Sequence, residues 1–171
     1  RLQFLAINEP EFLQVPNVDR ESPDAMLIRP PNFDPKKKYP VLIYAYSGPR
    51  APTVRDSWRG STYLWHQMLA HEGYCIWMCD NRSASMRGAK SSWPIHRDLG
   101  KHELADIETG ISWLKKQGWV DGERIGIWGW SYGGYMTAYA LTHSKSFRMG
   151  ISGAPVTDWR NYDAIYTERY M

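Results

Sequence analysis

The sequence predicts a three-layer α/β fold in which helices cover both faces of a mostly parallel β-sheet. Residues 41–46 and 75–79 are apolar at every position, as expected of strands that are buried on both faces of a parallel sheet. A third apolar run, residues 125–128, leads through a glycine-rich turn into a helix-forming segment. Helical patterns lie between these runs, and strands that alternate with helices form parallel sheets flanked by helices.

The composition is that of one globular domain. The 171 residues are enough for a sizeable core, and 43% hydrophobic with 23% charged residues argues against disorder. The formal net charge of +3 is too small and too scattered to predict nucleic-acid binding, so we expect residues 36–38, three lysines, to form a solvated loop. No stretch approaches the roughly 18 uninterrupted apolar residues of a membrane span, so no span is expected in this chain.

Residues 1–33 are predicted to form a β-rich lead-in to a main domain at residues 34–171. Within the lead-in, residues 11–15 and 25–29 could pair as strands across a turn-rich link at residues 19–24. The chain does not begin with methionine and shows no apolar segment typical of a signal peptide. We therefore expect the chain to be the middle of a longer protein.

Two helices are predicted between the strands. The first should end at Gly73 and bury one face, formed by Leu64, Trp65, Met68 and Leu69. A long polar loop is expected at residues 80–97. The next helix carries acidic residues such as Glu103 in its first half and lysines in its last turn, which matches the helix macrodipole. Its apolar positions step by three, four and three residues: Leu104, Ile107, Ile111 and Leu114.

The two cysteines, Cys75 and Cys79, belong to one predicted strand. Four residues at about 3.3 Å each place them roughly 13 Å apart, beyond the ~7 Å between Cα atoms that a disulfide can bridge. We interpret both as small buried hydrophobic residues, and the sequence indicates no metal site and no redox chemistry.

Residues 129–133 are Gly-Trp-Ser-Tyr-Gly. A bare Gly-x-Ser-x-Gly also occurs by chance in glycine-bearing loops, but its position between a strand and a helix is typical of a nucleophile elbow. Ser131 would stand at the carboxyl end of the strand, where the N–H of Tyr132, at a helix N-terminus, could stabilise an oxyanion. The tight backbone needs tiny neighbours, which are Gly129, Gly133 and Gly134.

With these residues the sequence resembles the prolyl oligopeptidase family of serine peptidases, and within it the dipeptidyl peptidase IV branch. The resemblance rests on the elbow and on further stretches in the same order. These are residues 38–41 with 46–49, Asp-Asn-Arg at 80–82, Leu-Gly at 99–100, Ala-Pro-Val at 154–156, and residues 159–171. One departure is Ser83, where the family usually has glycine, and it concerns the local loop conformation more than the chemistry.

The resemblance implies an α/β-hydrolase domain that is incomplete at its C-terminal end, with Ser131 as the nucleophile. It also implies two oxyanion donors, the N–H of Tyr132 and the hydroxyl of Tyr46. Tyr46 would stand at the carboxyl end of the neighbouring strand, where open α/β sheets bind ligands, although without the motif it would be interpreted as a core aromatic residue. The His-Gly-Gly-Gly loop of lipases is absent, which argues against a plain esterase.

The resemblance further implies a hydrophobic pocket for a proline or alanine side chain, lined by Val156, Trp159, Tyr162 and Tyr166. A small aromatic box would select flat, rigid proline by shape. From their spacing alone, Tyr162 and Tyr166 would instead mark one face of a helix that faces the core. No metal and no organic cofactor is implied.

The sequence does not supply a base for Ser131. In this fold the acid and the histidine follow the serine along the chain, and His143 lies roughly 18 Å down the next helix. Asp158 and Asp163 are expected to cap or flank helices, so the triad acid and base would lie beyond Met171. The histidines that precede the serine are expected to be solvated: His66, His71, His96 and His102.

The implied activity is hydrolysis of peptides after a penultimate proline or alanine, through an acyl-enzyme, with release of a dipeptide from a free N-terminus. The carboxylates that bind the free amine would precede Arg1, and this chain alone is expected to be inactive. Two alternatives stay open: an endo-acting prolyl oligopeptidase or acylaminoacyl peptidase, and a catalytically inactive interaction protein of the same fold. The resemblance also implies a possible homodimer and slightly favours a periplasmic or extracellular location.

Overall fold

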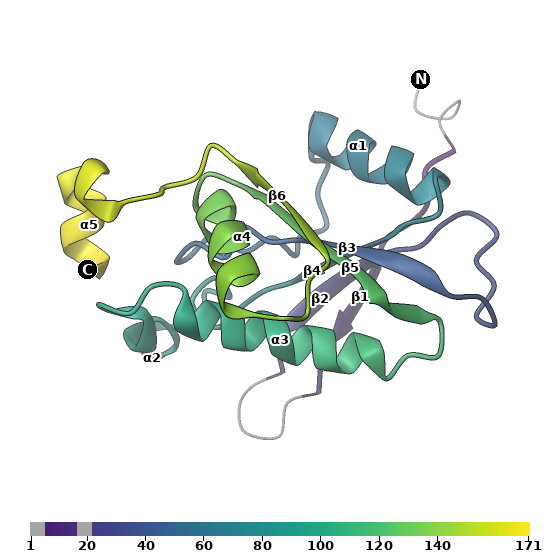
Figure 1. Cartoon of the computed structure of the whole chain (residues 1–171), viewed down its shortest axis with the longest axis horizontal. Coiled ribbons are helices and arrows are strands. Elements are labelled where there is room, and N and C mark those ends of the chain that lie inside the picture. The colour runs from purple at the N-terminus through teal and green to yellow at the C-terminus, as the bar shows by residue number, and fades with distance from the viewer. Residues whose placement is uncertain (1–5, 17–21) are drawn as a thin grey trace.

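One sheet of six strands organises the structure, a computed structural model that describes residues 6–16 and 22–171 (Figure 1). The strand order is β1-β2-β4-β3-β5-β6. The last four strands are mutually parallel, whereas β1 and β2 join them as an antiparallel edge. Residues 1–5, where the chain begins without methionine, and residues 19–21 of the predicted turn-rich link lie outside the described residues. The strands are β1 (Glu11–Gln14), β2 (Asp24–Ile28), β3 (Tyr39–Tyr44), β4 (Cys75–Cys79), β5 (Val120–Trp130) and β6 (Met149–Gly153).

Helices cover both faces of this sheet. Helix α1 (Gly60–His71) packs on one face, and α3 (Lys101–Lys115) and α4 (Tyr132–His143) pack on the other (Figure 1). Two shorter helices are α2 (Ala89–Ser92) and α5 (Ala164–Tyr170), and α5 stands apart from the sheet at the end of the molecule where the chain terminates. None of the helices in the described ranges is long and apolar enough to cross a membrane.

Side chains alternate between two cores along each central strand. Leu42 and Ile76 pack into the core beneath α1, whereas Ile43 and Trp77 pack into the core beneath α3 and α4. Both faces of these strands are therefore buried, which explains why their sequences are apolar at every position. The prediction of a three-layer α/β fold with a mostly parallel sheet is confirmed.

The N-terminal strand pair is also as predicted, with Leu13 opposite Ala25. Strand β2 pairs in turn with β4, so the lead-in contributes to the same sheet as the rest of the chain. The division at residue 33 between lead-in and main domain stays a prediction.

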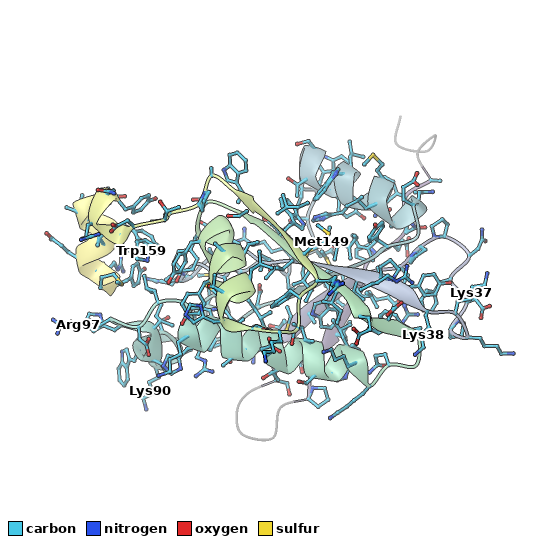
Figure 2. The ribbon with its side chains drawn as sticks, viewed as in Figure 1. Lys37, Lys38, Lys90, Arg97, Met149 and Trp159 are labelled. Atoms are coloured by element: carbon cyan, nitrogen blue, oxygen red, sulfur yellow. The ribbon has the colours of Figure 1, made fainter. Side chains whose placement is uncertain are left out.

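The predicted lysine loop is exposed, and Figure 2 shows Lys37 and Lys38 at the opposite end of the molecule from Trp159. Both cysteines are free. Burial raises the pKa of the Cys75 thiol to about 12 and also raises the pKa of the Cys79 thiol, so both stay protonated and unreactive near neutral pH.

The predicted buried face of α1 is wrong in part: Trp65 and Leu69 pack against the core beneath the helix as predicted, but the other two residues do not. Leu64 and Met68 are exposed to 39% and 53%, whereas His66 and Gln67 are buried. The reason is tertiary: the amide of Gln67 bonds both the N–H and the carbonyl oxygen of Asn8 at 2.8 Å, so a polar side chain tethers the helix to the N-terminal segment. The spacing of apolar residues in the sequence gives no information about such a hydrogen-bond partner.

The long loop predicted at residues 80–97 is also wrong in part, because it contains α2 and a turn of 3₁₀ helix at Trp93–Ile95. Pro94 lies in the first turn of that short helix, where its missing N–H costs nothing. Arg82 ties the start of the segment to α3 through a bidentate pair with Asp106 at 2.5 and 2.8 Å.

His66, expected to be solvated, is 1% exposed and lies among Tyr44, Trp65 and Trp128, with ring centroids 5.3 to 5.6 Å away. Neither ring nitrogen has a hydrogen-bond partner among the described residues. Burial, helped by the nearby charge of Arg59, lowers the pKa of His66 to about 4.

We expect the free energy of unfolding to fall as the pH drops from about 6.5 to about 4. The unfolded chain binds a proton at His66 in this window and the folded chain does not, so up to about 3 kcal/mol of stability is lost. Equilibrium unfolding at a series of pH values tests this. The variant His66→Leu should flatten the profile, whereas His143→Gln, at an exposed histidine, should leave it unchanged; equal profiles for all three proteins would contradict the prediction.

Candidate active site

Ser131 is the single residue between the end of β5 and the start of α4. Its backbone has φ 60° and ψ −118°, a conformation that L-residues rarely adopt and that costs free energy. Two hydrogen bonds hold it there: Ser131 N–H donates to the Gly153 carbonyl at 2.9 Å, and the Ser131 carbonyl accepts from Tyr135 N–H at 3.0 Å. The predicted strand–serine–helix arrangement of an elbow is therefore present.

The glycines around Ser131 allow backbones to approach closely. A Cβ atom on Gly129 or on Gly133 would overlap the carbonyl oxygen of Ala45, and one on Gly134 would overlap the carbonyl oxygen of Gly153. These neighbours are backbone atoms and cannot turn aside as a flexible side chain could. The requirement for tiny residues is thus steric.

Gly133→Ala is expected to destabilise the fold by about 3 kcal/mol or more, because the added methyl group must displace the backbone of Ala45 and Tyr46, just after β3. Thermal or denaturant unfolding measures the loss. Gly118→Ala is the matched control, since a Cβ there has no heavy atom within 4 Å among those described. Equal stability of the two variants would show that the elbow is not tightly packed.

Tyr46 lies next to Tyr132, the elbow residue that follows Ser131. Strands β3 and β5 are parallel neighbours, with Tyr44 opposite Trp128, so the residues that follow them meet at one edge of the sheet. The rings of Tyr46 and Tyr132 have centroids 6.3 Å apart. Tyr132 is the first residue of α4, and the first N–H groups of a helix have no acceptor within it.

The loop after Tyr46 is anchored to the end of β4. The buried carboxylate of Asp80 accepts from Thr53 N–H at 2.6 Å and from the Thr53 hydroxyl at 2.7 Å, and burial raises its pKa. Asn81 donates to the Ser47 carbonyl at 3.3 Å and to the hydroxyl of Ser83 at 2.7 Å. Ser83, at the position where glycine was expected, is fully buried, and its hydroxyl accepts this bond from Asn81.

Three of the four predicted pocket residues form one aromatic cluster. The ring centroids of Trp159, Tyr162 and Tyr166 lie 5.5 to 5.9 Å from one another. The Trp159 ring also lies 5.7 Å from the ring of Tyr132, which joins the cluster to the elbow. Val156, the fourth predicted pocket residue, is half-buried in the connection that follows β6.

The two aspartates of this segment cap helices, as predicted. Asp158 accepts from Arg160 N–H at 3.0 Å, and Asp163 accepts from Tyr166 N–H at 2.8 Å. Hydrogen bonds from Arg160 lower the pKa of Asp158 to about 2.

The histidines have surroundings other than Ser131. His143 stacks on Tyr139 at the far end of α4, with ring centroids 4.0 Å apart. His102 lies 3.6 Å from Asp98, and His71 lies 2.6 Å from the Ala6 carbonyl oxygen. His96 is exposed, so of the four histidines expected to be solvated only His66 is plainly buried.

Sequence reasoning missed one residue of this site, Glu103. Its side chain is fully buried, and it accepts from the Tyr132 hydroxyl at 2.6 Å and from Gly100 N–H at 3.0 Å. Burial raises the pKa of Glu103, and burial together with this carboxylate raises that of Tyr132. A capping pattern in the sequence could have indicated it, because Glu103 comes three residues after Gly100, the residue that precedes α3.

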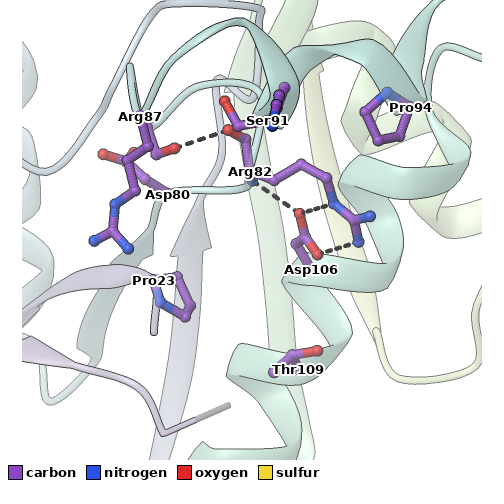
Figure 3. A pocket seen from close by; sticks show the side chains of 10 residues that line it. Pro23, Asp80, Arg82, Arg87, Ser91, Pro94, Asp106 and Thr109 are labelled. Atoms are coloured by element: carbon purple, nitrogen blue, oxygen red, sulfur yellow. Dashed lines mark hydrogen bonds and ion pairs between the residues drawn. The ribbon is translucent and has the colours of Figure 1, made fainter. Parts of the chain in front are cut away.

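A cavity of about 550 Å³ lies elsewhere, between the segment that follows β4 and α3 (Figure 3). Arg82, Asp106, Arg87 and Pro23 are among its lining residues. Two of its arginines form ion pairs: Arg82 bonds Asp106, and Arg87 bonds Asp24 at 2.8 Å. None of the predicted site residues lines it.

A serine held in a strained turn between a central parallel strand and the following helix, at the carboxyl edge of this sheet, defines an α/β-hydrolase. The chain belongs to the prolyl oligopeptidase family, whose model matches residues 61–171. The family resemblance noted in the sequence is therefore confirmed.

Individual relatives agree with this placement. The chain is 45% identical over 166 residues to the probable dipeptidyl-aminopeptidase B of Ajellomyces dermatitidis, a match over 95% of this chain and 18% of the relative. It is 45% identical over 146 residues to the protein of that name from Sclerotinia sclerotiorum, over 84% and 16%. The crystal structure of Porphyromonas gingivalis dipeptidyl peptidase 4 superposes with a TM-score of 0.89 at 38% identity, over 96% of this chain and 23% of that one. The chain thus spans less than a fifth of the length of the two dipeptidyl-aminopeptidase B relatives.

Proposed function

We propose that the chain is part of the catalytic domain of a longer serine peptidase, which removes dipeptides from peptides with a free N-terminus and a penultimate proline or alanine. The observation that carries the proposal is Ser131 in the elbow, with Tyr46 and Tyr132 beside it at the carboxyl edge of the sheet. The names of the relatives, dipeptidyl-aminopeptidase and dipeptidyl peptidase, support the exopeptidase assignment.

In the proposed reaction, Ser131 Oγ attacks the carbonyl carbon of the scissile bond as its proton passes to a histidine base. The resulting oxyanion accepts hydrogen bonds from Tyr132 N–H and the Tyr46 hydroxyl, which stabilise the tetrahedral intermediate more than the substrate. The base then protonates the leaving amine, the peptide bond breaks, and an ester to Ser131 remains. Water hydrolyses this ester by the same route. The base and its acid would come from segments outside this chain.

The aromatic cluster supports the substrate preference. Trp159, Tyr162 and Tyr166 form a group of rigid rings beside Tyr132, and with Val156 they would enclose a small apolar side chain. Proline fits such a box because it is flat and loses little conformational entropy on binding. A larger side chain would have to displace a ring.

The test uses the full-length protein and two substrates, a Gly-Pro chromogenic amide with a free amine and the same amide with a blocked N-terminus. We expect faster cleavage of the free amine. Equal or faster cleavage of the blocked amide would favour the endo-acting oligopeptidase or acylaminoacyl peptidase. No cleavage of either would contradict the proposal and favour the inactive interaction protein. The 171-residue chain by itself should cleave neither substrate at a rate that depends on Ser131.

A further inference from the structure

Glu103 connects α3 to the first residue of α4. As the third residue of α3 it accepts from Gly100 N–H, which is an ordinary capping bond. Capping uses one carboxylate oxygen. The other oxygen accepts from the Tyr132 hydroxyl, 29 residues further along the chain, at 2.6 Å, and the side chain has no exposed surface. A fully buried carboxylate that binds a second helix has a role beyond that of a cap.

The segment that contains Glu103 also holds the next tyrosine of α4. The Tyr135 hydroxyl donates to the Leu99 carbonyl at 2.7 Å. Gly100, with φ 102°, lies so close that a Cβ there would meet the Tyr135 hydroxyl and the Tyr139 ring at 2.9 Å. Residues 99–103 therefore fix the rotation of the first turn of α4, whose first amide is that of Tyr132.

The Tyr132 ring contacts both other parts of the site. Its centroid lies 6.3 Å from the ring of Tyr46 and 5.7 Å from that of Trp159. A shift of Tyr132 would therefore move its own N–H relative to Ser131, and it would change the support of Tyr46 and of the aromatic cluster. Errors of about 1 Å in such geometry cost large factors in rate.

We propose that Glu103 is a positioning residue, whose bond to the Tyr132 hydroxyl aligns the two oxyanion donors and the Trp159 wall of the pocket. This inference rests on the proposed function, because Tyr46 and Tyr132 have their oxyanion role only in that reaction. Glu103 itself touches no reacting atom.

The test compares Glu103→Gln, Tyr132→Phe and the double variant in the full-length protein, with Gly-Pro chromogenic amide as substrate. Tyr132→Phe keeps the capping bond between Glu103 and Gly100, so it carries the test if Glu103→Gln fails to fold. Glu108→Gln is the matched control, since Glu108 lies on the same helix and binds the hydroxyls of Ser144 and Ser146 away from the elbow. Each variant is measured for kcat, KM, melting temperature and affinity for a Gly-boroPro boronic acid, which forms a tetrahedral adduct with the nucleophile.

We expect Glu103→Gln and Tyr132→Phe each to lower kcat by about tenfold or more, the factor typical of a lost charged hydrogen bond. KM should change by less than about threefold, and boronic acid affinity should fall in parallel with kcat. The double variant should lose no more than the worse single variant, because both changes break one bond. Glu108→Gln should leave kcat and the boronic acid affinity unchanged.

Unchanged kcat and boronic acid affinity in Glu103→Gln or Tyr132→Phe, with only a lower melting temperature, would reduce Glu103 to a structural cap. Losses that multiply in the double variant would show that the bond is not the common cause. A wild-type protein that cleaves neither the free nor the blocked amide would overturn the proposed function and this inference together. An active wild type with fully active variants would overturn this inference alone.

Discussion

Ser131→Ala is expected to lower kcat of the full-length protein by about 10⁴-fold or more, because the proposed acyl-enzyme forms on the Ser131 hydroxyl. Ser131 is held with φ 60° between β5 and α4, so its position relative to the sheet edge is fixed by the backbone. Alanine has the same backbone preferences and should occupy this turn with similar strain. The melting temperature of the variant should therefore stay near that of the wild type.

The loss is measured as turnover of the free-amine Gly-Pro amide. Ser61→Ala, at an exposed serine in the first turn of α1, is the control and should keep full activity. Residual activity of Ser131→Ala within about tenfold of the wild type would show that another residue is the nucleophile.

Tyr46→Phe is expected to lower kcat by about 10²- to 10³-fold, which is the usual cost of removing one oxyanion donor. KM should change little, because the hydroxyl is proposed to bind the oxyanion of the transition state more strongly than the substrate carbonyl. The ring, which contacts Tyr132 with centroids 6.3 Å apart, is retained in the variant. Packing is therefore preserved while the donor is lost.

Tyr44→Phe provides the matched control two residues earlier. The Tyr44 ring stacks on Trp128 in the core beneath α1, with centroids 4.6 Å apart, and so faces the other side of the sheet from α4. The kcat of Tyr44→Phe should stay within about threefold of the wild type. Equal losses in the two variants would indicate a general effect of removing a tyrosine hydroxyl and would contradict the role of Tyr46.

Local patterns predicted the parts of the fold that depend on local sequence. The strands predicted at residues 41–46 and 75–79 could be identified because burial on both faces makes every position apolar, although β3 spans Tyr39–Tyr44 and ends two residues before Tyr46. The face of α1 could be predicted only in part: Trp65 and Leu69 pack on the core, but the burial of Gln67 depends on a bond to the backbone of Asn8, 59 residues away. The helix α2 was missed because it has four residues, too few for a periodic pattern.

The same distinction between local and tertiary determinants holds for the residues of the site. Ser131 and its glycines were predictable because the elbow is one continuous segment with a steric requirement at each position. Tyr46 came from the resemblance together with the rule that ligands bind at the carboxyl ends of parallel strands. Glu103 was interpreted as a match to the helix macrodipole, because its partner on α4 is set by tertiary packing and leaves no local signature. The pocket roles of Val156, Trp159, Tyr162 and Tyr166 stay predictions.

The central claim is that Ser131 is an activated nucleophile, and the most direct measurement is covalent labelling of the full-length protein with a fluorophosphonate. Such probes react with a serine activated by a base and an oxyanion site, and peptide mapping by mass spectrometry locates the adduct. We expect one phosphonylated residue, Ser131, and no adduct in Ser131→Ala. Labelling of another serine, or of none in the folded wild-type protein, would contradict the claim.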